Sequence, residues 1–118
     1  MDIRTESRNV PMAPRWQEEI ERRVHALQNG HNDIHHARMT LEKNRHHKKG
    51  PKIASARLVC NLRGGTFTAS KTDKTFEEAI RATFLAMEEE LQTYREKRKQ
   101  KARTESARRT PRKNGERV

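Results

Sequence analysis

The chain has 118 residues, of which 31% are hydrophobic and 36% are charged. That length suits one domain, and the scarcity of apolar residues restricts it to a small core. No apolar run is long enough to span a bilayer or to act as a signal peptide, and the single cysteine, Cys60, cannot form an internal disulfide. These features argue against a membrane protein and against a disulfide-stapled secreted domain, so we expect a soluble cytoplasmic protein.

The charge is strongly positive and unevenly distributed. The net charge is +11, and residues 95–118 hold 11 Lys or Arg against 3 acidic residues. Residues 1–94 hold 16 Lys or Arg against 13 acidic residues. Such an excess favours a polyanionic partner, with nucleic acid as the default. A membrane surface is a poorer match because the basic tail has no apolar face to insert.

The first two predicted elements are a short strand and a helix. In residues 2–8, Ile3, Thr5 and Ser7 alternate with charged side chains, which is typical of an edge strand. Pro14 suits the first turn of a helix, where its missing N–H costs little, and the helix should end near residues 29–30. Its apolar residues recur at steps of four, four and three: Trp16, Ile20, Val24 and Leu27.

Three further strands are predicted in the middle of the chain. Residues 33–43 and 53–62 each alternate apolar with polar side chains, so each should bury one face. Gly64-Gly65 interrupts the pattern and predicts a tight hairpin turn, after which residues 66–71 form the partner strand. Cys60 falls on the apolar side of its strand, where we expect a buried filler rather than a nucleophile.

The last predicted element is a long helix that begins at Phe76. Thr75, followed three residues later by Glu78, forms a capping box. The helix should continue to about Lys99, beyond which apolar anchors run out and residues 100–118 should form a disordered basic tail. Its apolar stripe predicts core contacts rather than a cofactor site: Phe76, Ala79, Ile80, Phe84, Met87, Leu91 and Tyr94.

Together these elements predict an α+β domain over residues 1–99 with the order β-α-β-β-β-α. We expect a four-stranded sheet with two helices packed on one face, because neither helix has another surface against which to bury its apolar stripe. The opposite face of the sheet should be open and polar, with Arg38, Thr40, Arg57 and Thr68 on it.

Basic side chains are the candidate binding residues. Residues 44–52 contain Gly-Pro and no acidic residue, which predicts a basic loop that either contacts phosphate or is simply solvated. Further cations lie on the first helix, beside this loop and near the end of the last helix. The predicted RNA-binding residues are Arg22, Arg23, Lys43, Arg45, Lys48, Lys49, Lys52, Arg57, Lys97 and Arg98.

Several of these stretches resemble a bacterial family, the ribosome hibernation-promoting factors and ribosome-associated inhibitors, in its short form. The strand that runs into Gly64-Gly65 and then into residues 66–70 is similar to the family's hairpin, and Ala79-Ile80 matches its Ala-Ile near the start of the last helix. Residues 39–43 resemble its second strand, and the spacing after Pro14 fits its first helix.

The resemblance implies a protein that binds the small ribosomal subunit and its ribosomal RNA. There it would occupy the channel used by messenger and transfer RNA and so inhibit translation on idle ribosomes, as part of a stress response. Such a mechanism needs no chemistry, because cations that neutralise phosphates and a compact body that excludes the normal ligands are sufficient.

The exposed side of the last helix departs from the family pattern. The family usually carries Lys and Arg there, whereas the matching positions in this chain are Ala86, Glu89 and Thr93, beside Glu88 and Glu90. Negative charge repels phosphate, although salt screens the repulsion over about 8 Å. We therefore expect the basic loop and tail to take over part of the contact, unless the partner itself has changed.

Two other functions fit parts of the pattern. Without the first strand, the order of elements matches a double-stranded RNA-binding domain, but that module needs a lysine-rich start to its last helix, and this helix starts with Phe76-Glu77-Glu78. Six histidines raise the alternative of a metal site, yet the chain has no thiolate pair and no ordered ligand spacing. We find no catalytic constellation in the sequence and predict neither an enzyme nor a cofactor.

Overall fold

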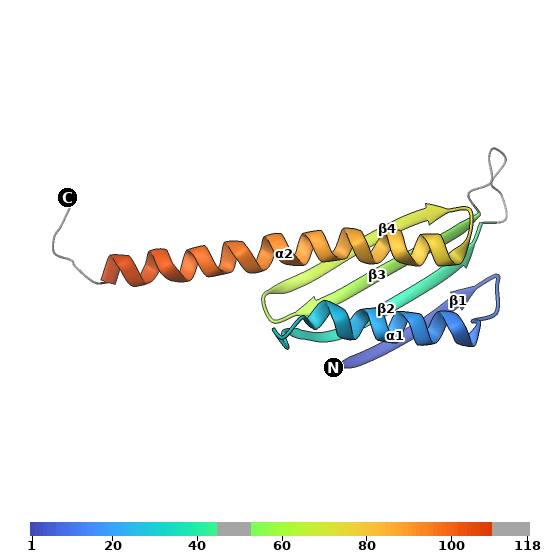
Figure 1. The fold of residues 1–118 in the computed structure, drawn as a ribbon, viewed down its shortest axis with the longest axis horizontal. Helices are drawn as coiled ribbons and strands as arrows, with labels where there is room; N and C mark the ends of the chain where they lie inside the picture. The colour runs from blue at the N-terminus through green and yellow to red at the C-terminus, as the bar shows by residue number, and fades with distance from the viewer. Residues whose placement is uncertain (45–52, 110–118) are drawn as a thin grey trace. The chain divides into compact units, whose positions relative to one another are not determined.

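A computed structural model of the chain describes residues 1–44 and 53–109, with side chains as far as residue 99. The elements follow the predicted order (Figure 1): β1 (Asp2–Arg8), α1 (Pro14–Gln28), β2 (Ile34–Lys43), β3 (Ala54–Leu62), β4 (Gly65–Asp73) and α2 (Phe76–Arg109). The chain divides into two units, Met1–Glu88 and Glu89–Val118, with the boundary inside α2. None of the described helices combines the length and apolar character needed to cross a membrane.

The four strands form one mixed sheet in the order β1-β2-β3-β4. β1 runs parallel to β2, while β2, β3 and β4 are successively antiparallel. In one row across the sheet, Thr5 lies opposite Met39, Met39 opposite Leu58, and Leu58 opposite Ala69. This register gathers the apolar side of every strand onto a single face, so the predicted α+β fold is confirmed.

The core lies between that sheet face and the helices. Trp16, Ile20, Val24 and Leu27 of α1 are buried, as the helical spacing predicted. In Figure 1, α1 and the first part of α2 lie on the same side of the sheet. The remaining core side chains of the unit formed by residues 1–88 come from the three longer strands and the start of α2. They are Ile34, Ala37, Met39, Leu41, Ala54, Ala56, Leu58, Cys60, Leu62, Ala69, Phe76, Ala79, Ile80, Phe84 and Met87.

The other sheet face, here named the open face, is mostly polar and lies on the side of the sheet opposite α1 and the first part of α2 (Figure 1). It consists of alternate residues from each strand in four cross-strand rows. The rows are Asp2-His36-Asn61-Thr66, Arg4-Arg38-Val59-Thr68, Glu6-Thr40-Arg57-Ser70 and Arg8-Glu42-Ser55-Thr72. The predicted positions of Arg38, Thr40, Arg57 and Thr68 on this face are confirmed.

The helix termini follow local chemistry. The Thr75 hydroxyl accepts a hydrogen bond from the Glu78 N–H at 3.1 Å, which is the N-cap half of the predicted capping box, and it donates one to the Glu78 carboxylate at 3.1 Å. α1 ends at Asn29, whose left-handed φ of 43° closes the last turn. The expected end of α2 near Lys99 was wrong, because the helix continues to Arg109. Residues 100–109 contain neither glycine nor proline, so nothing in their backbone chemistry interrupts the helix.

A buried hydrogen bond from Thr83 links α2 to the sheet. It is the one buried polar side chain among the described residues, with no exposed surface. Its hydroxyl lies 2.7 Å from the Ala79 carbonyl oxygen, one turn earlier in α2, and 3.2 Å from the Ala56 carbonyl oxygen in β3. A single hydroxyl proton therefore serves two buried acceptors, one in the helix and one in the strand.

We expect Thr83→Val to lower the free energy of unfolding by about 1 kcal/mol, because the isosteric valine cannot donate the hydrogen bond that links α2 to the Ala56 carbonyl oxygen in β3. The measurement is the urea midpoint and slope. Thr93→Val, at an exposed position of the same helix, corrects for the change in helix propensity. Equal midpoints for the two variants would contradict the role assigned to the hydroxyl.

Candidate nucleic-acid interface

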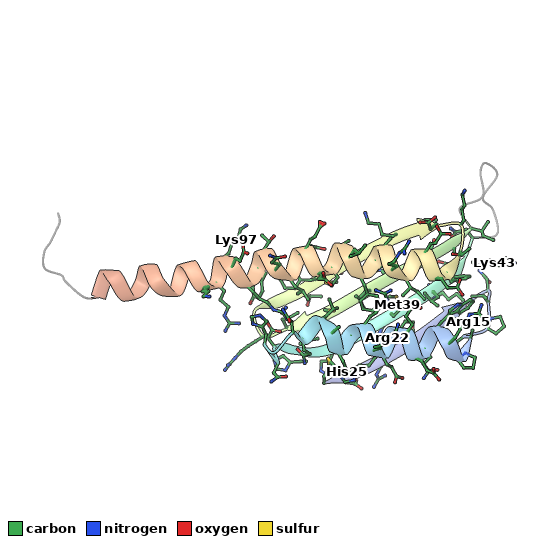
Figure 2. All side chains as sticks on the ribbon, viewed as in Figure 1. Arg15, Arg22, His25, Met39, Lys43 and Lys97 are labelled. Atoms are coloured by element: carbon green, nitrogen blue, oxygen red, sulfur yellow. The ribbon has the colours of Figure 1, made fainter. Side chains whose placement is uncertain are left out.

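Arginines line the outer surface of α1, and they differ in whether an acidic side chain pairs with them. Arg23 is half-buried, and its Nε donates a hydrogen bond to the Glu19 carboxylate at 2.8 Å. Arg22 is exposed and forms no ion pair with any residue that the structure describes. Figure 2 shows Arg15, Arg22 and His25 along this helix. Arg22 is therefore the α1 arginine whose charge is most available to a phosphate.

Glu77 neutralises the first arginine of α1 and joins the starts of the two helices. Its carboxylate accepts hydrogen bonds from the Trp16 indole N–H at 2.8 Å and from Arg15 Nε at 3.0 Å. The hydrogen bond from Trp16 is the main cause that lowers the pKa of Glu77, helped by its own backbone N–H and by Arg15 and opposed by partial burial. The ring centroids of Trp16 and Phe76 are 4.8 Å apart. Glu77 thus supports the packing of the helices and offsets the charge of Arg15.

Among the other predicted cations of the first unit, Arg57 lies on a different surface from those of α1. Arg57 lies on the open face, opposite Thr40 and Ser70, whereas α1 covers the apolar face. Lys43 is exposed at the end of β2, and its backbone carbonyl accepts a 3.4 Å hydrogen bond from Asn9. In the first unit, cations therefore lie on both faces of the sheet.

The remaining members of the predicted set belong to other parts of the chain. Lys97 and Arg98 are exposed on α2, in the unit formed by residues 89–118. The predicted loop contacts Arg45, Lys48, Lys49 and Lys52 lie outside the described residues. The assignment of this whole set to RNA contact stays a prediction.

Arg4 and Arg38 are two cations outside the predicted binding set. The parallel register of β1 and β2 places Arg4 directly opposite Arg38, on the same face as Arg57. Periodicity alone put Arg38 on the open face. The position of Arg4 depends on a pairing between strands that are separated by a helix, and no local pattern in the sequence specifies that register.

Histidines are scattered rather than grouped. His25, His31, His35 and His36 are all exposed. Within residues 1–44 and 53–99, no three His, Cys, Asp or Glu side chains come together as a possible metal site. His46 and His47 lie outside these ranges. The described geometry therefore offers cations and hydrogen-bond donors rather than a ligand set for an ion.

Comparison with known proteins agrees with this architecture. The family model described as "Sigma 54 modulation protein / S30EA ribosomal protein" matches residues 3–99. A ribosomal subunit interface protein from Coxiella burnetii has the same fold, with a TM-score of 0.70 and 19% identity over 80% of this chain and 98% of that one. The N-terminal domain of Protein Y from Thermus thermophilus gives a TM-score of 0.67 and 19% identity over 80% of this chain and 99% of that one. A search of curated proteins found no match.

We expect Glu77→Gln to reduce stability at pH 7 by less than about 1 kcal/mol, as befits a half-exposed ion pair. Because the pKa of Glu77 is lowered in the folded protein, its contribution is present above the unfolded-state pKa and disappears as pH falls through the folded-state pKa. The difference in free energy of unfolding between Glu77→Gln and the wild type should therefore disappear below about pH 4, near the usual pKa of glutamate.

The measurement is urea unfolding across this pH range, followed by the fluorescence of Trp16, the single tryptophan of the chain. Glu18→Gln, at an exposed position of α1, is the control. A gap that stays constant with pH would show that the Glu77 carboxylate does not contribute through its charge.

Proposed function

Because this chain belongs to the Sigma 54 modulation protein / S30EA ribosomal protein family, we propose that it is a ribosome-associated translation inhibitor of the hibernation type. It binds the RNA of the small ribosomal subunit in the channel used by messenger and transfer RNA, and excludes both. The observation that carries this proposal is the family match over residues 3–99, which spans all four strands, α1 and most of α2. A cytoplasmic location follows from a ribosomal partner.

The charge of the protein supports an RNA partner. The chain has a net charge of +11, and exposed cations such as Arg22, Lys43 and Arg57 are held on helices and strands of a fixed fold. Cations that replace the counterions of RNA gain free energy from counterion release, and that gain falls as salt rises. Inhibition by occupancy requires only this attraction and the volume of the folded domain, so no catalytic group is assigned.

The start of α2 argues against a duplex-RNA module. At that start, the Glu77 carboxylate accepts hydrogen bonds from Trp16 and Arg15, and the Glu78 carboxylate accepts one from the Thr75 hydroxyl. Both carboxylates are therefore part of the helix architecture, where a duplex-binding module would present lysines to phosphate. Structured RNA outside the ribosome remains the alternative partner, and the binding experiment below includes it.

We expect Arg22→Glu to weaken binding to purified small subunits, because it places a negative charge at the α1 arginine that has no acidic partner among the described residues. Reversal of Lys48, Lys49 and Lys52 together should also flatten the salt dependence, by about 0.7–0.9 log units of affinity per log unit of salt for each lost contact. The measurement is co-sedimentation with small subunits over a salt series.

Arg63→Glu, at an exposed position of the β3–β4 turn outside the predicted set, is the control for net charge. Messenger and transfer RNA should compete with the wild-type protein, and a plain RNA duplex should bind more weakly than the small subunit. A duplex that binds as tightly as the small subunit would overturn the ribosomal assignment in favour of a general RNA-binding role.

We expect the triple change Glu88→Gln, Glu89→Gln and Glu90→Gln to tighten binding to small subunits at low salt. All three side chains are exposed, and their charges oppose an approach of this part of α2 to phosphate. The gain should shrink as salt rises, because screening shortens the range of the repulsion. The same co-sedimentation series measures it, with Glu18→Gln as the control. Unchanged affinity at every salt concentration would show that this part of α2 faces away from the RNA.

A further inference from the structure

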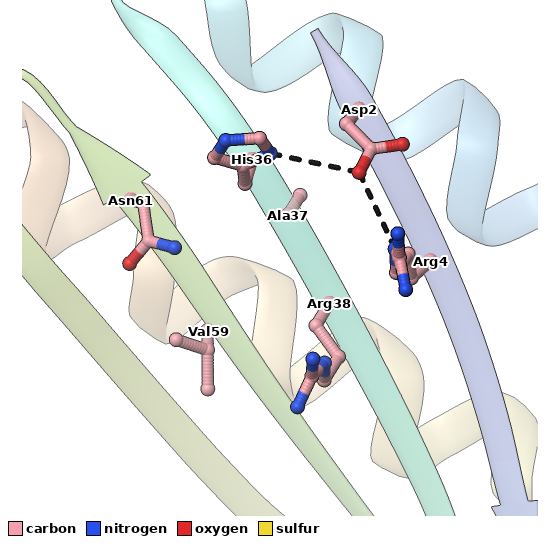
Figure 3. A pocket seen from close by; sticks show the side chains of 7 residues that line it. All are labelled: Asp2, Arg4, His36, Ala37, Arg38, Val59 and Asn61. Carbon is pink, nitrogen blue, oxygen red and sulfur yellow. Dashed lines mark hydrogen bonds and ion pairs between the residues drawn. The ribbon is translucent and has the colours of Figure 1, made fainter.

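The open face contains a hollow that the ribosomal proposal does not use. It encloses about 460 Å³ and is lined by Asp2, Arg4, His36, Ala37, Arg38, Val59 and Asn61 (Figure 3). These side chains belong to two consecutive cross-strand rows of β1, β2 and β3. Val59 lies opposite Arg38 in the strand register, so the lining combines an apolar side chain with cationic and polar ones.

Arg38 is the cation of this hollow that is free to meet a ligand. Asp2 already lies 3.3 Å from Arg4 Nε and 3.6 Å from His36 Nδ1. Arg38 is exposed and forms no ion pair within the described residues. In Figure 3 its guanidinium stands beside Val59, apart from the contacts of Asp2. A guanidinium in this position offers both a forked donor for a phosphate and a flat surface for stacking.

Asn61 adds a directed donor on the far side of the hollow. Its Oδ1 accepts a 2.9 Å hydrogen bond from the Thr66 hydroxyl, which orients the amide. In Figure 3 the amide nitrogen of Asn61 points from β3 toward β2. The amide of Asn61 offers a hydrogen-bond donor to the edge of a nucleobase, and the guanidinium of Arg38 offers donors to its phosphate.

The volume and the mixture of groups match one nucleotide better than a bare anion. Pockets for small ligands begin at about 300 Å³, and they combine an apolar surface with a few placed polar groups. Proteins that read single-stranded RNA splay out a base and stack it on an aromatic ring or a guanidinium plane. The four rows of the open face carry no Phe, Tyr or Trp, and the planar groups that line the hollow belong to Arg4, Arg38 and His36. Arg4 and His36 lie against Asp2, whereas Arg38 has no acidic partner among the described residues.

We propose that this hollow binds one nucleotide of single-stranded RNA, with its phosphate at Arg38 and its base over Val59 beside Asn61. The site lies on the sheet face opposite α1, so it is separate from the α1 arginines assigned to ribosomal RNA and does not depend on that assignment. One molecule would then carry RNA-binding groups on both sides of its sheet.

The test is an NMR titration of the full chain with adenosine 5′-monophosphate and with an eight-residue oligouridylate. Signals of the Val59 methyls and the Asn61 side-chain amide should shift saturably with both probes. Arg38→Ala should weaken binding about tenfold, because it removes a charge-assisted hydrogen bond. Asp2→Asn should strengthen binding about twofold to fivefold, because it removes the negative charge beside the phosphate position.

Arg81→Ala, at an exposed position of α2, and Glu18→Gln, at an exposed position of α1, are the charge-matched controls and should bind like the wild type. Inorganic phosphate and an octaglutamate peptide test whether any anion suffices. The proposal is overturned if Arg81→Ala weakens binding as much as Arg38→Ala does, or if octaglutamate shifts Val59 and Asn61 as strongly as the nucleotide. It is also overturned if the Val59 and Asn61 signals do not move. Co-sedimentation of Arg38→Ala with small subunits reports on the ribosomal proposal independently.

Discussion

A single apolar layer between one face of the sheet and the helices is the constraint on which the rest of this structure depends. With 31% hydrophobic residues, the chain can bury one face of a four-stranded sheet and leaves the other face polar. α1 and the first part of α2 supply the cover, and Thr83 adds the one buried polar link between helix and strand among the described residues. The open face therefore follows from the small number of apolar residues. A ligand could bind there without disturbing the packing of the core.

Local patterns were sufficient to predict every element. Alternation identified β1 even though its apolar residues are few, Pro14 marked the first helical residue of α1, and Thr75 with Glu78 marked the start of α2. The end of α2 was predicted too early because the apolar anchors run out near Lys99, whereas the absence of glycine and proline from residues 100–109 leaves the backbone able to continue the helix.

The candidate sites depended on non-local geometry that the sequence does not encode in any short stretch. The pairing of Arg4 with Arg38 exists because β1 and β2 are parallel neighbours on either side of a helix. The lowered pKa of Glu77 arises from Trp16, 61 residues away in the chain. Periodicity can place a residue on a face, but the register between strands and the contacts between helices decide which charges are already paired.

Fold and surface charge are under different constraints in this chain. Solved relatives with 19% identity share its fold, which requires only apolar residues at the right spacing. Surface charge is under no such constraint, and here Glu88, Glu89 and Glu90 are exposed on α2 while arginines occupy the open face. A protein built in this way can keep a ribosomal partner while altering which side chains meet the RNA.

Hydroxyl-radical footprinting of the RNA in small subunits saturated with the protein would test the central proposal most directly. The proposal predicts protection of the nucleotides that line the channel for messenger and transfer RNA, and loss of that protection when those ligands are added in excess. Protection confined to other parts of the subunit, or a cleavage pattern identical to that of the free subunit, would contradict inhibition by occupancy of the channel.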